Sequence, residues 1–266
     1  MVQEKANRSI EDNNPSSDSV EFFKISLAEK NIEIECNYRD VFFQCRNYLS
    51  KFKKPDIVVN VTLQEIEKEQ DNDIELLQRL FSVDKKNIGI TYDFGQLESL
   101  LIYRKIADAM IKYGIILIHG AAISKDNRCY VFMAPSGTGK TTHLLNWLRM
   151  IPEAFVVNGD KPLVDVKNKF VYGTPWCGKE GFNTNTCVPL SGLIVLERGT
   201  INEIHRINFC EMLPILLGQS YIPTEVISVS NAFQLIAQLK AVPCYLFKCN
   251  MDKESAIVAY NELAKS

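Results

Sequence analysis

A short glycine-containing run at residues 134–141 has the residue types and spacing needed to bind phosphate groups. It reads APSGTGKT, with Ala134 in place of the first glycine of the general pattern. Glycines let successive main-chain N–H groups converge on phosphate oxygens, Lys140 neutralises the outer phosphates, and the hydroxyl of Thr141 can ligate Mg²⁺. The residues expected to bind a nucleotide are Ser136, Gly137, Thr138, Gly139, Lys140, Thr141 and Thr142.

Two further side chains could act on phosphate groups. Asp160 follows the apolar run 154–157, and an acid at that place can hold Mg²⁺ or accept the proton of a nucleophile. Because Asn-Gly-Asp is also a strong turn sequence, spacing alone favours neither the acid nor a solvated turn. His119 could orient a phosphate or a hydroxyl, although a lone histidine more often has a structural role.

A glycine-rich stretch at residues 172–181 adds an aromatic ring, a thiol and two charges close behind Asp160. It reads YGTPWCGKEG, and such a segment can form a lid or a wall of a substrate site. The alternative is an ordinary connecting loop. Cys177 could be an accessible thiol in the first case.

A phosphate loop requires an apolar strand before it and a helix after it, and the sequence predicts both. The expected strand is 129–133 and the expected helix 140–150. A hairpin-like turn is expected at 126–128. Further strands are predicted at 114–119, 154–157, 170–172, 192–197 and 244–248, and helices at 232–240 and 254–263.

The first half of the chain has a different pattern of expected strands and helices. Strands are expected at 22–27, 32–36 and 56–61, helices at 41–52 and 93–112, and one or two helices within 62–80. Residues 1–19 are polar and predict a disordered tail. The predicted domains are therefore this tail, an α+β region at 20–113 and an α/β phosphate-loop domain at 114–266.

The composition narrows the class of partner. Lys plus Arg total 30 against 32 acids, a net charge of −2, which gives no support for a nucleic-acid or membrane-surface partner. No segment has the length of apolar residues that spans a bilayer, and the first twenty residues lack the apolar core of a secretory signal. A cytoplasmic location is therefore expected. The eight cysteines show no zinc-ligand spacing and are expected to be reduced thiols.

Several of these runs together resemble the HPr kinase-like family, whose fold is shared with ATP-dependent phosphoenolpyruvate carboxykinase. The resemblance covers roughly residues 114–262. Within the family, these residues are most similar to the stand-alone serine-kinase-like proteins of bacterial peptide-modification clusters. It rests on the runs HGAA, VFMAPSGTGKTTHLLNWL, VVNGDKPLV, VYGTPWCGKEGFNTN and VPLSGLIVLERG. It implies an α/β P-loop kinase domain of the HPr kinase type, and it extends to no residue of 20–113.

The resemblance also implies roles for individual residues. Lys140 matches the phosphate-binding lysine, Thr141 the Mg²⁺ ligand, and His119 the histidine before the phosphate-loop strand. Asp160 matches the second Asp of the family's pair, which accepts the proton of the substrate serine and can also contact the metal. Gly159 stands where the first Asp is expected. Glu180 is a guess for the family's additional Mg²⁺-binding glutamate.

Together these features predict a kinase that uses ATP and Mg²⁺ to phosphorylate a serine-type hydroxyl of a protein, a peptide or a small molecule. The resemblance also implies a homo-oligomer. Three alternatives stay open at this point: a nucleotide sensor in which Gly159 has weakened catalysis, a carboxykinase-type lyase, and a similar fold that binds no nucleotide. The sequence does not identify the acceptor or the role of residues 20–113.

Overall fold

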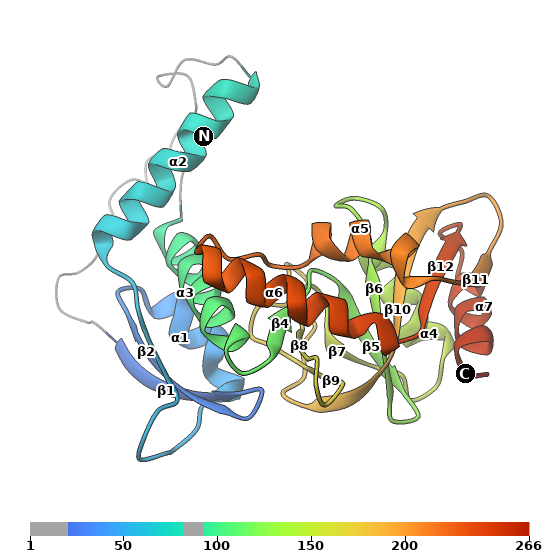
Figure 1. Ribbon diagram of the computed structural model, residues 1–266, viewed down its shortest axis with the longest axis horizontal. Helices are drawn as coiled ribbons and strands as arrows, with labels where there is room; N and C mark the ends of the chain where they lie inside the picture. Colours follow the sequence, from blue (N-terminus) through green and yellow to red (C-terminus); the bar gives the residue numbers. More distant parts are fainter. Residues whose placement is uncertain (1–20, 82–92, 266) are drawn as a thin grey trace, which may run out of the picture. The chain divides into compact units, whose positions relative to one another are not determined.

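The structure, a computed structural model, describes residues 21–81 and 93–265 (Figure 1). The expected disordered tail at 1–19 lies outside these residues. The chain divides into two compact units, of which the first comprises the residues up to Ile25 and Asn31–Tyr103. The second comprises Ser26–Lys30 and Arg104 onwards. The chain is thus a mixed α/β protein with helices and sheets in both halves of the sequence.

The first unit is built on a three-stranded sheet in the order β1-β2-β3, in which β2 and β3 are parallel. The elements of this part of the chain are β1 (Glu21–Leu27), β2 (Lys30–Cys36), α1 (Arg39–Cys45), the 3-10 helix η1 (Arg46–Tyr48), β3 (Ile57–Asn60), α2 (Leu63–Phe81) and α3 (Phe94–Ile111), whose residues from Arg104 on belong to the second unit. Alternate residues of the strands are buried, as the period of two requires: Phe23, Ile25, Ile32, Ile34, Ile57 and Val59. The predicted helix 41–52 is too long, because the α-helix ends at Cys45 and only the 3-10 helix η1 follows it.

The second unit contains a nine-stranded sheet with the path β4-β8-β9-β10-β6-β5-β7, while β12 pairs with both β10 and β11. Its strands are β4 (Ile115–Leu117), β5 (Ala121–Lys125), β6 (Arg128–Met133), β7 (Phe155–Asn158), β8 (Leu163–Asp165), β9 (Phe170–Tyr172), β10 (Cys187–Arg198), β11 (Glu203–Ile207) and β12 (Cys244–Cys249). Strands β6, β10 and β12 run parallel to one another. Their carboxyl ends therefore share one edge of the sheet, the edge at which α/β proteins bind ligands.

Helices cover both faces of this sheet, and β6 shows why. Cys129, Val131 and Met133 belong to the core cluster that includes residues of α5 and α6. Tyr130 and Phe132 belong to the opposite cluster, which includes residues of α4 and α7. The helices are α4 (Lys140–Met150), α5 (Phe209–Gln219), α6 (Val226–Gln238) and α7 (Glu254–Leu263), with the 3-10 helix η3 (Leu239–Ala241) after α6. A strand that is buried on both faces consists of a continuous run of apolar residues, which is why β6 could be predicted from the sequence.

Most predicted elements of this unit are confirmed, and the departures have local causes. The predicted strand 114–119 is shorter, so His119 lies just outside β4. The predicted 192–197 is only the apolar end of β10, whose first residues include Pro189 and alternate between buried and partly exposed. β5, β8 and β11 were not expected from the sequence, nor was α5. The last begins with a capping box between Asn208 and Glu211, a sequence signature that could have located it.

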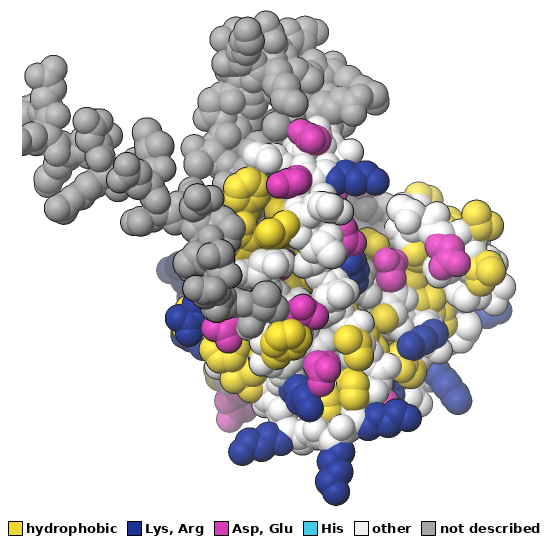
Figure 2. Space-filling view, turned by 90° about the vertical axis from the view of Figure 1, so that its left-hand side faces the viewer, with side chains coloured by type: hydrophobic (Ala, Val, Ile, Leu, Met, Phe, Trp, Pro, Cys, Tyr) yellow, Lys and Arg dark blue, Asp and Glu magenta, His cyan; other side chains and the backbone are white. Residues whose placement is uncertain are grey.

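Among the described residues, no helix is both long enough and apolar enough to cross a bilayer. On the face drawn in Figure 2, Lys and Arg side chains are most numerous along the lower margin, and acidic side chains lie scattered above and among them.

Candidate functional site

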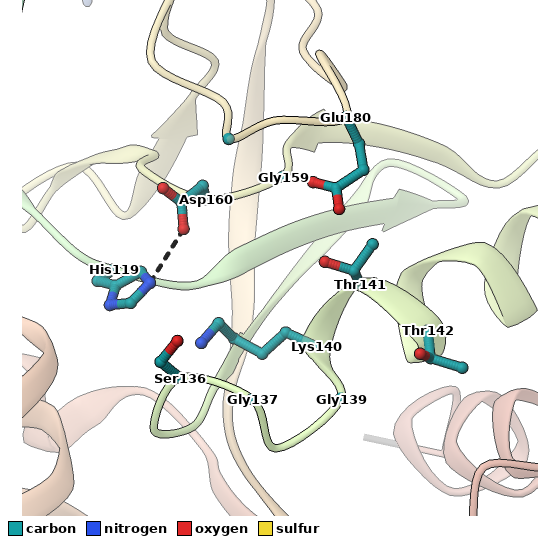
Figure 3. A pocket seen from close by; sticks show the side chains of 11 residues that line it. His119, Ser136, Gly137, Gly139, Lys140, Thr141, Thr142, Gly159, Asp160 and Glu180 are labelled. Carbon is teal, nitrogen blue, oxygen red and sulfur yellow. Dashed lines mark ion pairs between the residues drawn. The ribbon is translucent and has the colours of Figure 1, made fainter. Parts of the chain in front are cut away.

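The predicted phosphate loop lies between the carboxyl end of β6 and the start of α4 (Figure 3). Gly137 and Gly139 have φ of 77° and 121°, in a region that side-chain-bearing residues rarely adopt. A hydrogen bond from the Thr138 N–H to the Pro135 carbonyl, 3.3 Å, closes the turn. The strand, turn and helix thus follow one another as a phosphate loop requires.

The first turn of α4 leaves main-chain donors available at the loop. The N–H of His143 donates to the Gly139 carbonyl at 3.0 Å, across the cap of the helix. The N–H groups of Lys140, Thr141 and Thr142 precede it, where no carbonyl of the helix can accept from them. Converging donors at the positive end of a helix dipole form a site for an anion.

Lys140 extends along the inside of the loop. Its Nζ donates to the Ala134 carbonyl at 2.7 Å. Burial lowers the pKa of Lys140 from its ordinary value, although the nearby Asp160 carboxylate opposes that shift. A partly desolvated ammonium that hydrogen-bonds a neutral carbonyl gains from an anion placed beside it, as a phosphate would be.

Arg198, at the end of β10, contacts the loop from outside and was missed in the sequence. Its Nη2 donates to the Gly137 carbonyl at 2.6 Å and its Nε to the Thr138 carbonyl at 3.3 Å. The C=O and N–H of a trans peptide point in opposite directions. Holding the Thr138 carbonyl therefore turns the N–H of Gly139 away from Arg198. The signal in the sequence was only the strand predicted just before this arginine.

The candidate acid stands on a turn that follows β7. Asn158, fully buried, accepts hydrogen bonds at Oδ1 from the N–H of Asp160 at 2.8 Å and of Lys161 at 2.6 Å. Its Nδ2 donates to the carbonyl and the hydroxyl of Thr174, each at 3.0 Å. The Asn-Gly-Asp sequence is therefore a turn, as one alternative had it, and this same turn presents the carboxylate to the loop.

Both oxygens of the Asp160 carboxylate contact basic side chains. Oδ1 lies 2.9 Å from His119 Nε2, and Oδ2 accepts a close hydrogen bond from Lys161 Nζ. Burial by itself would raise the pKa of Asp160, but the hydrogen bonds from His119 and Lys161 lower it, to about 2. Asp160 is thus an anion at neutral pH. A carboxylate only accepts, so Nε2 of His119 carries the proton in this pair.

His119 is fixed by its main chain as well as by Asp160. It lies between β4 and β5, where its N–H donates to the Gln219 carbonyl at 2.6 Å. The next N–H, of Gly120, donates to the Asp160 carbonyl at 2.8 Å. Backbone and side chain together hold the imidazole against the carboxylate.

Gly159, where the resemblance implies a first Asp, has no room for a side chain. A Cβ at this position would lie 2.9 Å from the Cys177 carbonyl and 3.3 Å from the Phe182 carbonyl. The N–H of Gly159 also donates to that Phe182 carbonyl at 2.8 Å. The 173–186 loop thus packs directly on the turn, and Glu180 of this loop supplies the second carboxylate of the site.

These groups line one cavity of about 340 Å³. Of the residues predicted from the sequence, Thr138 alone does not line it, and its carbonyl bonds Arg198 instead. Figure 3 shows His119 and Asp160 at one side of the cavity and Thr142 at the other. The lining residues are His119, Ser136, Gly137, Gly139, Lys140, Thr141, Thr142, Gly159, Asp160, Gly178 and Glu180.

The interpretation of Cys177 as an accessible thiol is wrong. The residue is buried, and its Sγ accepts a hydrogen bond from Asn183 Nδ2 at 3.0 Å. Burial raises the pKa of its thiol, whereas a reactive cysteine needs a lowered one. The carbonyl of Cys177 matters more, since it approaches Gly159.

The oxygen donors fit Mg²⁺ only together with a phosphate ligand. Within the described parts of the chain, no three His, Cys, Asp or Glu side chains form a group that could hold a metal. Mg²⁺ in phosphoryl-transfer sites uses one or two carboxylates together with substrate phosphates. The Thr141 hydroxyl and the Asp160 and Glu180 carboxylates, which line the same cavity, are donors of that kind.

Comparisons with known proteins add little to this geometry. No family model matches the chain, and no curated protein sequence matches it. Among solved structures, the chain is similar to the Hpr(Ser) kinase/phosphatase from Coxiella burnetii, with 14% identity and a TM-score of 0.28. That similarity covers 56% of this chain and 91% of the other. A TM-score of this size does not establish a shared fold, so the function must be inferred from the cavity itself.

Proposed function

We propose that this protein is an ATP-dependent kinase that transfers the γ-phosphoryl group to a serine-type hydroxyl of a protein, a peptide or a small molecule. One observation carries the proposal. The His119–Asp160 pair lines the same cavity as Lys140 and the amino-terminal end of α4. A phosphate-binding loop and a fixed carboxylate in one cavity are the two parts that phosphoryl transfer to a hydroxyl needs.

The loop side accounts for binding of the triphosphate. The main-chain N–H groups of residues 139–142 and the Lys140 ammonium would bind the phosphate oxygens, together with the hydroxyl of Ser136, which lines the same cavity. Since these donors are already fixed, little reorganisation is needed as charge develops on the transferred group. Arg198 acts indirectly, by holding the loop carbonyls outside the cavity.

The opposite side accounts for the acceptor. The acceptor oxygen forms a bond to the γ-phosphorus while the bond from that phosphorus to the β–γ bridging oxygen breaks, which leaves ADP. The hydroxyl proton passes to Asp160. A carboxylate with a pKa of about 2 is a weak base, so its main contribution is to orient the hydroxyl, and His119 holds it in place.

Thr141 and Asp160 would hold Mg²⁺, with Glu180 as a further oxygen donor. When bound there, the ion would supply positive charge that offsets the phosphates. The predicted division near residue 113, a cytoplasmic location and a homo-oligomer remain part of this proposal as predictions.

The test is ATP turnover with Mg²⁺ in the presence of serine-containing peptides or free serine, followed as ADP release and as the mass of one phosphate on the acceptor. Asp160→Asn should lower turnover about 1000-fold, while the affinity for ATP measured without Mg²⁺ stays within about threefold. Lys140→Ala should instead weaken ATP binding itself. Asp126→Asn, on the β5–β6 turn outside the cavity, is the matched control and should behave as wild type.

Two outcomes would favour other functions. ATP binding without turnover on any hydroxyl acceptor would favour a nucleotide sensor, for which the missing side chain at Gly159 is the specific observation. An absence of any thermal shift with ATP and Mg²⁺ would contradict nucleotide binding altogether.

A further inference from the structure

The segment that follows β12 lies against the phosphate loop. β6, β10 and β12 are parallel neighbours, so the loop after β6, Arg198 at the end of β10 and the segment after β12 all stand at one sheet edge. The contact is close, since a Cβ at Gly139 would lie 2.6 Å from Met251 Cε. The side chain of Met251 therefore packs on the loop at the glycine that precedes α4.

Met251 is an apolar side chain that stays 42% exposed beside a polar cavity. Its main chain is held in place: Nδ2 of Asn146, a buried residue of α4, donates to the Met251 carbonyl at 3.2 Å and to the Asp252 carbonyl at 3.0 Å. Asn250 reinforces the turn, since its Oδ1 accepts from the Asp252 N–H at 3.1 Å. These hydrogen bonds fix the main chain around Met251 and thereby keep its thioether exposed.

The residues at the two sides of the cavity indicate in which orientation a triphosphate would bind. His119 and Asp160, which face the transferred group, lie at one side, and Thr142 lies at the other (Figure 3). In a phosphate loop the lysine reaches the β- and γ-phosphates, while main-chain amides bind the α- and β-phosphates. The α-phosphate, and with it the nucleoside, therefore belongs at the Thr142 side.

We infer that the segment after β12 forms the nucleoside subsite of this protein, with the Met251 thioether as the apolar surface on which the base of the nucleotide lies. The inference rests on the proposed function and adds to it the part of the molecule that recognises more than phosphate. A polarizable, unbranched thioether suits the flat face of a purine ring, which it contacts without a hydrogen bond. Because Met251 also packs on Gly139, the base and the phosphates are bound by adjoining parts of one surface.

The experiment compares two probes, ATP and inorganic tripolyphosphate, each with Mg²⁺, by calorimetric titration of the full chain. Met251→Ala should weaken ATP binding about tenfold, because it removes apolar contact area, and should leave tripolyphosphate binding within about twofold. Met251→Leu, which keeps an apolar surface, should bind ATP within about threefold of wild type. Ile227→Ala, an exposed apolar residue of α6 that does not line the cavity, is the matched control.

The outcomes separate this inference from the proposed function. Unchanged ATP affinity in Met251→Ala, or an equal loss for both probes, would overturn the nucleoside subsite and leave the phosphate loop intact. Failure of the wild-type chain to bind either probe would overturn the proposed function and this inference with it.

Discussion

The two walls of the cavity are constructed in different ways. The phosphate loop consists of consecutive residues whose donors at the start of α4 are left for a ligand; Arg198 holds two of its carbonyls from outside, and the Met251 side chain packs on Gly139. The Asp160 turn is held by hydrogen bonds that it donates to separate parts of the chain, including the carbonyls of Thr174 and Phe182. The wall formed by the phosphate loop is therefore a local structure that would bind the phosphates. The wall formed by the Asp160 turn is held by tertiary contacts and positions the carboxylate.

Because of this difference, substitutions in the two walls should change different quantities, turnover in one case and ATP affinity in the other. Damage to the turn should displace Asp160 and reduce turnover, while ATP still binds to the loop. Damage to the loop should reduce ATP affinity first. A variant that broke this pattern would show that the two walls act as one unit.

Asn158→Ala is expected to have the largest effect. It removes four hydrogen bonds from a fully buried side chain and leaves donors unpaired, which should lower the free energy of unfolding by about 2–4 kcal/mol. Displacement of Asp160 should also cut turnover about 100-fold. Urea denaturation and steady-state ADP release measure the two effects, and ATP affinity should stay within about threefold.

Asn146→Ala is the matched control on the other wall, since this buried asparagine holds the Met251 segment. It should lower stability as well, but should weaken ATP binding more than it lowers turnover at saturating ATP. Equal kinetic effects of the two asparagine variants would contradict the proposal that one wall binds the nucleotide and the other positions Asp160.

Gly139→Ala should have a smaller effect, confined to the loop. A φ of 121° is strained for alanine by about 1–3 kcal/mol, and the new Cβ would also meet the side chain of Met251. We expect ATP affinity to fall about tenfold. Gly137→Ala has similar strain but no atom within 4 Å of its Cβ, so its affinity should fall by less, about threefold. Equal losses in the two variants would show that the contact with Met251 adds nothing to the cost of a side chain at Gly139.

The smallest effect concerns acid stability beneath the loop. Burial lowers the pKa of His143 to about 3, so the unfolded state binds its proton first as the pH falls. The stability contributed by neutral His143 is full above its unfolded pKa of about 6.5 and is lost as the pH falls towards 3. In His143→Gln, which can still accept from Trp147, the urea midpoint should fall less steeply between about pH 7 and pH 5.

The same contrast explains what could be read from the sequence. β6, the loop and α4 are consecutive, and each has a strong local signal: an apolar run, glycines, and a helical pattern. They were predicted with bounds that differ from the observed ones by one residue at most. The turn at Asp160 gave an even choice, because its main stabilising partner, Thr174, lies in a different segment of the chain.

Contacts between distant residues explain the remaining misses. Arg198 and Met251 meet the loop only because β10 and β12 are parallel to β6, and pairing of strands so far apart leaves no periodic signal in the sequence. β5, β8 and β11 are short, at three to five residues, and take their conformation from neighbours. The substitution at Gly159 was visible, but its cause, the close packing of the 173–186 loop, was not.

The two basic neighbours of Asp160 have a consequence for how the rate should respond to acid. With a pKa of about 2, this carboxylate keeps its charge across the whole range in which the protein can be assayed. Any acid-side decline in a pH–rate profile must then belong to a different titrating group, such as the acceptor, the nucleotide or another side chain. Before each transfer, Asp160 would be an anion at every pH of the assay, and its own titration would not shape the profile.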